Sequence, residues 1–319
     1  MTRILVTGSA GMLGHDVVSL LREHGEDVTA LTRDELDIRD EARVRSAMGD
    51  LKPDVVVNCA AWTAVDDAER HEDEALALNG HAVAVLAAAC RDSGAKLVHP
   101  STDYVFPGDA TSPYAEDAAT GPRSAYGRTK LAGERAVREM LPESGYVVRT
   151  AWLYGAHGKN FVYTMMRLAR AGKSPSVVDD QHGQPTWTAD VARQIHALIA
   201  TGAPPGVYHA TSSGQTTWCG FAREIFEKLS TERSRALSAP TGIAAPFPRE
   251  ITVTPITTAE YPLPAPRPAY SVLGHSAWEP AGIQPIGDWR DALHRAFPEL
   301  LAASPGGTTA QTPPCEKRV

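Results

Sequence analysis

A tyrosine and a lysine in the middle of the chain have the spacing for acid–base chemistry. Tyr126 and Lys130 stand four residues apart in a segment with helical periodicity, so their side chains share one face of the expected helix. A free phenol has a pKa of about 10, and a neighbouring ammonium favours the phenolate and lowers that pKa. The pair is suited to moving a proton onto or off an oxygen. Solvated surface pairs with the same spacing are common, so the context decides.

A hydroxyl residue completes this group. Ser101 and Thr102 follow an apolar strand predicted over residues 96–99. Ligands of open α/β sheets bind beyond the carboxyl ends of the strands. Thr102 is therefore our candidate to donate a hydrogen bond to the substrate oxygen beside Tyr126, with a turn-closing role as the alternative.

A glycine-rich turn near the start of the chain offers a place for a dinucleotide. Gly8, Gly11 and Gly14 lie between an apolar run at residues 4–7 and a helical pattern at residues 13–24. Glycines there allow a tight turn and let backbone N–H groups approach a pyrophosphate at the helix N-terminus. A turn without a ligand is the alternative, but the strand and helix around it are the context that the motif requires. Together with the Tyr/Lys pair, this turn predicts hydride transfer between a nicotinamide and a carbonyl or alcohol.

The residue after the second predicted strand bears on the choice of nicotinamide. Arg33 follows the strand at residues 27–31, where many dehydrogenases carry an acid for the ribose of NADH. A guanidinium can hold a 2′-phosphate, so Arg33 favours NADPH, with NADH as the alternative cofactor. A solvated loop arginine is the competing interpretation.

Apolar strands alternate with helical patterns through the first half of the chain. This alternation is typical of an α/β protein with a Rossmann-type doubly wound parallel sheet. We expect a dinucleotide-binding domain over residues 1–150 and a smaller C-terminal substrate-binding lobe over residues 151–302, some elements of which return to the first domain. After Ser238 the chain is proline-rich, with little helix expected and strand content near residues 251–254. Residues 303–319 are expected to be a disordered tail. The predicted elements are strands at 55–58, 146–149 and 207–210, and helices at 40–48, 72–93, 124–140, 161–171, 188–200 and 217–229.

Bulk composition excludes several classes of protein. The 319 residues are 43% hydrophobic and 22% charged, with a net charge of -7, which argues against a nucleic-acid partner. Apolar runs fall short of the roughly 20 residues of a membrane span. The four cysteines are far apart and form no CxxC, so neither a disulfide scaffold nor a zinc knuckle is expected. The start of the chain lacks the features of a signal peptide, and we expect the cytoplasm.

Longer motifs indicate that the chain resembles a known family. The resemblance covers most of the chain, from Thr2 to about Pro298. Besides the glycine turn and the Tyr/Lys segment, the motifs are NCAAWTAVD at 58–66, STDYVF at 101–106, RTAWLYG at 149–155, DQHGQPT at 180–186 and RPAYSVL at 267–273. With these motifs the chain resembles the RmlD-type reductases, a branch of the extended short-chain dehydrogenases/reductases. The resemblance implies NAD(P)H-dependent reduction of a dTDP-4-keto-6-deoxy sugar.

The resemblance also implies roles for individual residues. Tyr126 would be the proton donor, Lys130 its partner, and Thr102 would tune the contact with the carbonyl. The cofactor would contact Gly8, Gly11, Met12, Leu13, Gly14, Asp37, Ile38, Ala60, Ala61, Trp62, Tyr126 and Lys130. Lys130 would reach the hydroxyls of the nicotinamide ribose. Asp103 and Trp152 would contact the sugar nucleotide, with a core aromatic as the alternative for Trp152. Arg267 is a candidate for the diphosphate, since guanidinium matches phosphate geometry, and a surface arginine is the equal alternative.

Two departures accompany this resemblance. Some family members dimerise through magnesium held by glutamates, one of them early in the first helix. His15 stands at that place in this sequence. Magnesium binding and the choice between monomer and homodimer therefore stay open, and no metal ligand is assigned. The usual tyrosine of the Ala-Ala-Tyr segment is replaced by Trp62.

Three alternative functions accompany this resemblance. A dTDP-dihydrostreptose synthase or another deoxysugar 4-ketoreductase is the nearest alternative. A sugar-nucleotide epimerase or dehydratase comes next, although Thr102-Asp103 lacks the Asp-Glu pair of dehydratases. The third is a non-catalytic regulatory subunit of the methionine adenosyltransferase type.

Overall fold

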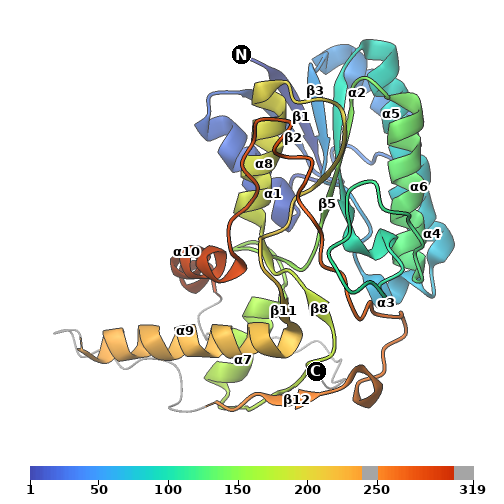
Figure 1. Cartoon of the computed structure of the whole chain (residues 1–319). Coiled ribbons are helices and arrows are strands. Elements are labelled where there is room, and N and C mark those ends of the chain that lie inside the picture. Colours follow the sequence, from blue (N-terminus) through green and yellow to red (C-terminus); the bar gives the residue numbers. More distant parts are fainter. Residues whose placement is uncertain (239–250, 305–319) are drawn as a thin grey trace.

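A six-stranded parallel sheet forms the centre of the larger lobe (Figure 1). The computed structural model describes residues 1–238 and 251–304. In spatial order the sheet runs β2, β1, β3, β4, β5 and β10. The chain winds one way from β1 to β2 and resumes on the other side of β1 with β3, so a topological switch point lies between β1 and β3, where such sheets bind ligands. The strands are β1 (Arg3–Thr7), β2 (Asp27–Leu31), β3 (Val55–Asn58), β4 (Lys96–Thr102), β5 (Gly145–Thr150) and β10 (Gly206–His209).

Helices cover both faces of this sheet (Figure 1). Successive side chains of β1 point to opposite faces, and both faces are apolar: Val6 packs beneath α1 and α8, whereas Leu5 packs beneath α2 and α5. Continuous burial on both faces explains why the strands are continuous apolar runs. The helices are α1 (Met12–Glu23) and α8 (Thr188–Thr201) on one face, and α2 (Glu41–Leu51), α5 (Ala82–Ser93) and α6 (Ala125–Met140) on the other.

The helix predicted over residues 72–93 contains a wide π-helical turn. It is divided into α4 (Glu72–Leu76), the π-helical segment Ala77–His81 and α5, and is preceded by the short α3 (Val65–Ala68). The turn places Asn79 against the backbone of Trp62: the Trp62 N–H donates to Asn79 Oδ1 at 2.8 Å and Asn79 Nδ2 donates to the Trp62 carbonyl at 3.0 Å. This pairing fixes the segment that follows β3, beside the switch point.

The smaller lobe packs three helices and short strands around its own apolar core. Phe221, Met165 and Phe297 are among the fully buried residues of that core. α9 is longer than predicted, and α10 is a helix where a loop-rich segment was expected; its apolar residues recur at helical spacing from Trp289 to Leu300. The elements are β6 (Leu153–Tyr154), α7 (Phe161–Arg170), β7 (Ser176–Val178), β8 (His182–Gly183), β9 (Thr186–Trp187), β11 (Thr216–Thr217), α9 (Trp218–Ser238), β12 (Thr254–Ile256) and α10 (Trp289–Ala303), with 3₁₀ turns Asp103–Val105 and Thr258–Glu260.

The later part of the chain departs from its prediction in one further detail. The strand expected near residues 251–254 begins at Thr254, because the segment pairs with β7 in the register Pro255 to Val177. The expected tail lies outside the described residues apart from Ala303 and Ser304, which end α10. Among residues 1–238 and 251–304, the helices lack the length and apolar character needed to cross a membrane.

Candidate active site

A cleft of about 500 Å³ opens at the carboxyl ends of β1, β3, β4 and β5. It brings together most of the residues singled out in the sequence: Gly11, Met12, Leu13, Gly14, Ala61, Thr102, Asp103, Tyr126, Lys130 and Trp152. The remaining lining residues are Asn58, Cys59, Thr63, Val65, Pro100, Ser101, Tyr104, Thr150, Ala151, Leu153 and Trp218. Residues from six segments of the chain therefore meet at the switch point of the sheet.

The glycine turn has the close backbone contacts that only glycine allows. Gly8 has a φ of 65°, and a Cβ there would lie 2.5 Å from the backbone nitrogen of Ala60. A Cβ on Gly14 would lie 2.4 Å from the carbonyl oxygen of Gly8. Gly11 is the N-cap of α1 and has no side chain to cap the first-turn N–H groups. This turn fits the pyrophosphate of a dinucleotide, because it leaves backbone donors and a helix N-terminus facing the cleft.

Burial raises the pKa of Tyr126 to about 12, and a hydrogen bond with Thr102 offsets part of this rise. The sequence predicted the opposite direction, on the assumption that the Lys130 ammonium acts on the phenol. In the structure the Nζ of Lys130 donates to the carbonyl oxygen of Pro100 at 2.8 Å. Desolvation therefore dominates, and the phenol holds its proton through the neutral pH range.

Lys130 ends a buried polar chain that runs under the cleft. Its Nζ lies 3.4 Å from Nε2 of His99, and His99 Nδ1 lies 3.3 Å from the side-chain amide of Asn58. Asn58 in turn accepts a hydrogen bond from the Thr7 hydroxyl at 2.7 Å. Burial lowers the pKa of Lys130 to about 8, with Glu134 opposing the shift. Sequence reasoning did not assign His99 or Asn58 to the site, although a polar residue within or ending an apolar strand was the available signal.

Thr102 both closes a turn and faces the cleft. Its hydroxyl donates to Asp103 Oδ1 at 2.9 Å and accepts from the backbone N–H of Tyr104 at 3.2 Å. It caps the 3₁₀ turn that follows β4 and also contacts Tyr126. Asp103 is 2% exposed, and burial raises its pKa from 3.8 to about 6. The structure therefore supports the turn-closing interpretation, and donation from Thr102 to a substrate oxygen stays a prediction that requires its single proton to leave Asp103.

The raised pKa of Asp103 predicts a dependence of stability on pH. The folded state holds this proton more tightly than the unfolded state, so the contribution is fully present below the unfolded pKa of 3.8 and is lost as pH rises through about 6. The free energy of unfolding of the wild type, measured by urea denaturation relative to Asp103→Asn, is therefore expected to fall across that window. The exposed Asp117→Asn is the control and should show no such trend. A difference that rises with pH would contradict the assignment.

Trp152 forms an aromatic wall with a tryptophan that the sequence analysis missed. Its ring stacks on that of Trp218, with centroids 3.6 Å apart and planes 10° from parallel. A Cβ on Gly183 would lie 2.4 Å from the Trp152 ring, so a glycine is needed there. Trp152 has a φ of 46°, a conformation that costs a bulky residue about 1–3 kcal/mol. In sequence, Trp218 has no feature that distinguishes it from a core aromatic.

Arg267 lies beside a second, smaller cavity. The cavity has a volume of about 240 Å³ and shares Tyr104 and Trp218 with the cleft, so the two are continuous along one wall. The Nη2 of Arg267 donates to Asp66 Oδ2 at 2.7 Å, and the arginine side chain is 15% exposed. Arg267 is therefore an ion-paired, mostly buried arginine at the wall of this second cavity, unlike a loop arginine in solvent.

Several expected cofactor residues are not among those that line the cleft. Arg33 is exposed on the loop after β2. Asp37 is paired with Arg39, which lowers the pKa of the Asp37 carboxyl to about 2. Ile38 is 1% exposed within the core beneath α2 and α5. Trp62 packs near Tyr126 against a small group of alanines.

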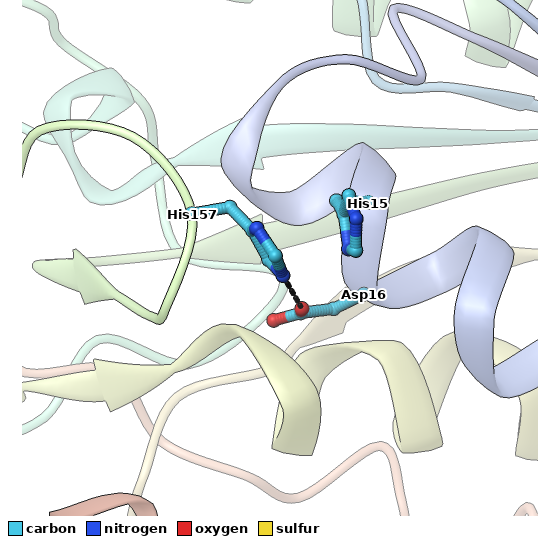
Figure 2. Close-up of side chains that lie close together, drawn as sticks. All are labelled: His15, Asp16 and His157. Atoms are coloured by element: carbon cyan, nitrogen blue, oxygen red, sulfur yellow. Dashed lines mark ion pairs between the residues drawn. The ribbon is translucent and has the colours of Figure 1, made fainter. Parts of the chain in front are cut away.

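The place where the resemblance suggested magnesium holds two imidazoles. His15, Asp16 and His157 lie together there, with one ligand atom from each within 4.8 Å of the others (Figure 2). Mg²⁺ requires near-octahedral oxygen ligands and binds imidazole poorly. A further carboxylate, Asp190 of α8, lies near this group, since Arg193 interacts with both Asp190 and Asp16. Asp190 is already paired with Arg193 and Arg295. These residues do not fit magnesium.

A parallel sheet with a glycine turn after β1, and a Tyr/Lys pair beside the end of β4, defines a short-chain dehydrogenase/reductase. Structures of sugar-nucleotide epimerases share this fold; one from Thermus thermophilus superposes with a TM-score of 0.76 at 20% identity, covering 94% of this chain and 99% of the epimerase. Residues 1–302 match the family described as RmlD substrate binding domain, and the chain belongs to this family.

Two relatives and a solved structure are similar to this chain over nearly its whole length. A Streptomyces griseus protein named dTDP-4-dehydrorhamnose reductase is 52% identical over 302 residues, which cover 93% of this chain and 94% of the relative. A Streptomyces niveus protein named dTDP-4-keto-6-deoxy-D-glucose reductase is 51% identical over 300 residues, covering 94% and 98%. The structure of dTDP-4-dehydrorhamnose reductase from Bacillus anthracis in complex with NADP superposes with a TM-score of 0.83 at 35% identity, covering 93% and 99%.

Proposed function

We propose that this protein uses NADPH to reduce the 4-keto group of a dTDP-6-deoxy-4-keto-hexose, with dTDP-4-dehydro-L-rhamnose as substrate and dTDP-L-rhamnose as product. The observation that carries the proposal is that Tyr126, Lys130 and Thr102 line one cleft with the glycine turn. The relatives named above supply the class of substrate. When bound, NADPH supplies the hydride.

Tyr126 is the proton donor in this proposal. Reduction of a ketone needs one proton on the oxygen, and the raised pKa of Tyr126 keeps the phenol protonated at neutral pH. Thr102 holds that phenol by a hydrogen bond and shares the cleft wall with it. Lys130 lines the same cleft, and because its Nζ donates to the Pro100 carbonyl at 2.8 Å, its role in this proposal is to hold the hydroxyls of the nicotinamide ribose beside Tyr126.

The sugar nucleotide occupies the tryptophan side of the cleft in this proposal. The stacked pair of Trp152 and Trp218 provides a flat apolar wall for a ring. Asp103, buried beside Thr102, faces the same space. Arg267 lies at the adjoining cavity, where its guanidinium suits a diphosphate.

The particular sugar can be decided by comparing two substrates. The Streptomyces niveus relative is named for a different 4-keto sugar, dTDP-4-keto-6-deoxy-D-glucose, and is almost equally similar. We expect kcat/KM, measured by oxidation of NADPH, to be higher for dTDP-4-dehydro-L-rhamnose by about tenfold or more. A tenfold preference for dTDP-4-keto-6-deoxy-D-glucose would instead assign that ketone as the substrate, and the reaction would still be reduction of a 4-keto group.

Arg33→Ala tests the preference for NADPH. If the guanidinium binds the 2′-phosphate, its loss removes a charged hydrogen bond and raises KM for NADPH by about 10–100-fold. KM for NADH, which lacks that phosphate, should stay unchanged and serves as the internal control. Equal effects on both cofactors would show that Arg33 is a solvated loop residue.

His99→Phe tests the polar chain beneath Lys130. The substitution keeps a ring of similar size and removes the nitrogen that lies 3.4 Å from Nζ. Burial is the main cause of the lowered pKa of Lys130, and an apolar ring in place of the imidazole deepens that burial, so the pKa of Lys130 should fall below about 8 and activity should be lost at lower pH on the alkaline side of the kcat profile. His99→Gln, which restores a polar side chain, should recover the wild-type profile. Reduced activity with an unmoved alkaline limb would mean that His99 acts only through packing.

We further propose a cytoplasmic enzyme that is a monomer or a homodimer. Cys59, Cys90 and Cys219 are free thiols, which suits a reducing compartment. Sedimentation of the purified protein decides between the two oligomeric states.

A further inference from the structure

Two imidazoles and a carboxylate lie together where α1 faces the loop that precedes α7 (Figure 2). The rings of His15 and His157 stack with centroids 3.4 Å apart and planes 27° from parallel. The Nε2 of His157 lies 4.0 Å from Asp16 Oδ1, which is longer than a hydrogen bond. The donor atoms are thus grouped closely, yet the imidazole and the carboxylate do not satisfy each other.

Asp16 has an oxygen with no partner. Its side chain is 10% exposed, and within residues 1–238 and 251–304 its Oδ2 finds no hydrogen-bond partner. The neighbouring Thr188 hydroxyl donates instead to the carbonyl oxygen of Tyr154 at 3.2 Å. A buried carboxylate oxygen without a partner is costly, and a bound cation removes that cost.

The donor set selects the class of cation. Imidazole nitrogen suits Zn²⁺ and its first-row neighbours, whereas Mg²⁺ takes oxygen ligands. Two histidines and one carboxylate form a frequent three-residue set for Zn²⁺, with the fourth position left to water or to another ligand. Glu299 of α10 is exposed and interacts electrostatically with all three residues, so its negative charge favours a cation there.

We propose that His15, Asp16 and His157 form a binding site for a transition-metal dication of the Zn²⁺ class, and that Mg²⁺ does not bind there. The site joins α1 to the loop at residues 155–160. That loop also contacts the start of α1, since Asn160 Nδ2, which donates to the Gly155 carbonyl within the loop at 2.8 Å, lies 3.9 Å from the sulfur of Met12, a residue of the cleft wall. The bound cation therefore connects α1, which forms part of the cleft wall, to the loop that leads into the smaller lobe.

Metal binding to the whole chain, without an affinity tag and freed of metal by a chelator, tests this proposal. Calorimetric titration is expected to show one Zn²⁺ bound per chain, Co²⁺ to give visible absorption bands of a nitrogen-ligated ion, and Zn²⁺ to raise the melting temperature. Mg²⁺ at millimolar concentration should do none of these. His157→Ala, at a half-exposed position that tolerates truncation, should weaken Zn²⁺ binding by at least about 100-fold, since changes in outer-shell partners alone cost about 10–100-fold.

The chain contains a matched control on the same helix. His24, at the C-terminal end of α1, stacks on His196 with centroids 4.1 Å apart, and this pair belongs to no three-ligand cluster among the described residues. His24→Ala should bind Zn²⁺ as the wild type does. Three results would each overturn the proposal. The first is equal Zn²⁺ binding by the wild type and His157→Ala, the second is an equal loss of Zn²⁺ binding in His24→Ala, and the third is binding of Mg²⁺ in place of Zn²⁺. None of these measurements uses substrate, so their outcome is independent of the proposed reduction.

Discussion

Replacing Tyr126 with phenylalanine is expected to lower kcat by about 10²–10⁴-fold, the usual contribution of a positioned proton donor. The substitution removes one oxygen and its proton and leaves the ring that packs edge-on against Tyr104. The dissociation constant for NADPH, measured by fluorescence titration, should stay within a factor of about two because the glycine turn lies apart from the phenol.

Tyr146→Phe is the matched control for this loss. Its phenol is also buried but donates to the carbonyl oxygen of Ala203, far from the cleft. That variant should lose about 1 kcal/mol of stability and keep its kcat. A Tyr126→Phe enzyme with near-normal kcat would show that another group delivers the proton.

Glu134→Ala is expected to have the largest effect on stability, a loss of about 3–5 kcal/mol. Glu134 and Arg149 form a bidentate ion pair at 2.8 Å, with both side chains 2% exposed. The pair ties α6, which carries Tyr126 and Lys130, to β5 at the edge of the cleft. Truncation leaves the Arg149 guanidinium buried, and within the described part of the chain its remaining polar contacts are the Glu116 carbonyl and His209. Chemical denaturation followed by circular dichroism measures the loss.

Two companion variants separate this ion pair from helix propensity. Glu139→Ala removes an exposed glutamate from the same helix and should change the free energy of unfolding by less than about 0.5 kcal/mol. Glu134→Leu combined with Arg149→Met replaces the pair with apolar side chains and should recover most of the loss. If Glu134→Ala were no worse than Glu139→Ala, the pair would contribute nothing to the position of α6.

The backbone framework was predictable from local patterns. Strands buried on both faces are largely apolar, as in β3, where three valines precede Asn58. The turn after β1 needs glycine because the φ of Gly8 is 65° and the backbone of Ala60 approaches too closely for a Cβ. The periodicity of α6 placed Tyr126 and Lys130 on one face, and both line the cleft. These features depend on residues that are near one another in sequence.

What could not be predicted depends on contacts between distant segments. The direction of the Tyr126 pKa shift was wrong because it follows from burial, which the spacing to Lys130 does not reveal. The partnership of Lys130 with His99 and the stacking of Trp218 on Trp152 join different elements. The π-helical turn exists because Asn79 reaches the backbone of Trp62, a contact outside the period of the helix.

Transfer of a labelled hydride tests the central claim most directly. NADPH carrying deuterium at the transferred position of the nicotinamide would be incubated with the protein and dTDP-4-dehydro-L-rhamnose, and the product examined by NMR. We predict dTDP-L-rhamnose with deuterium at C4 of the sugar and one NADPH oxidised for each product formed. Unconsumed NADPH, or a product without deuterium at C4, would contradict the assignment of this protein as a reductase of dTDP-4-dehydro-L-rhamnose.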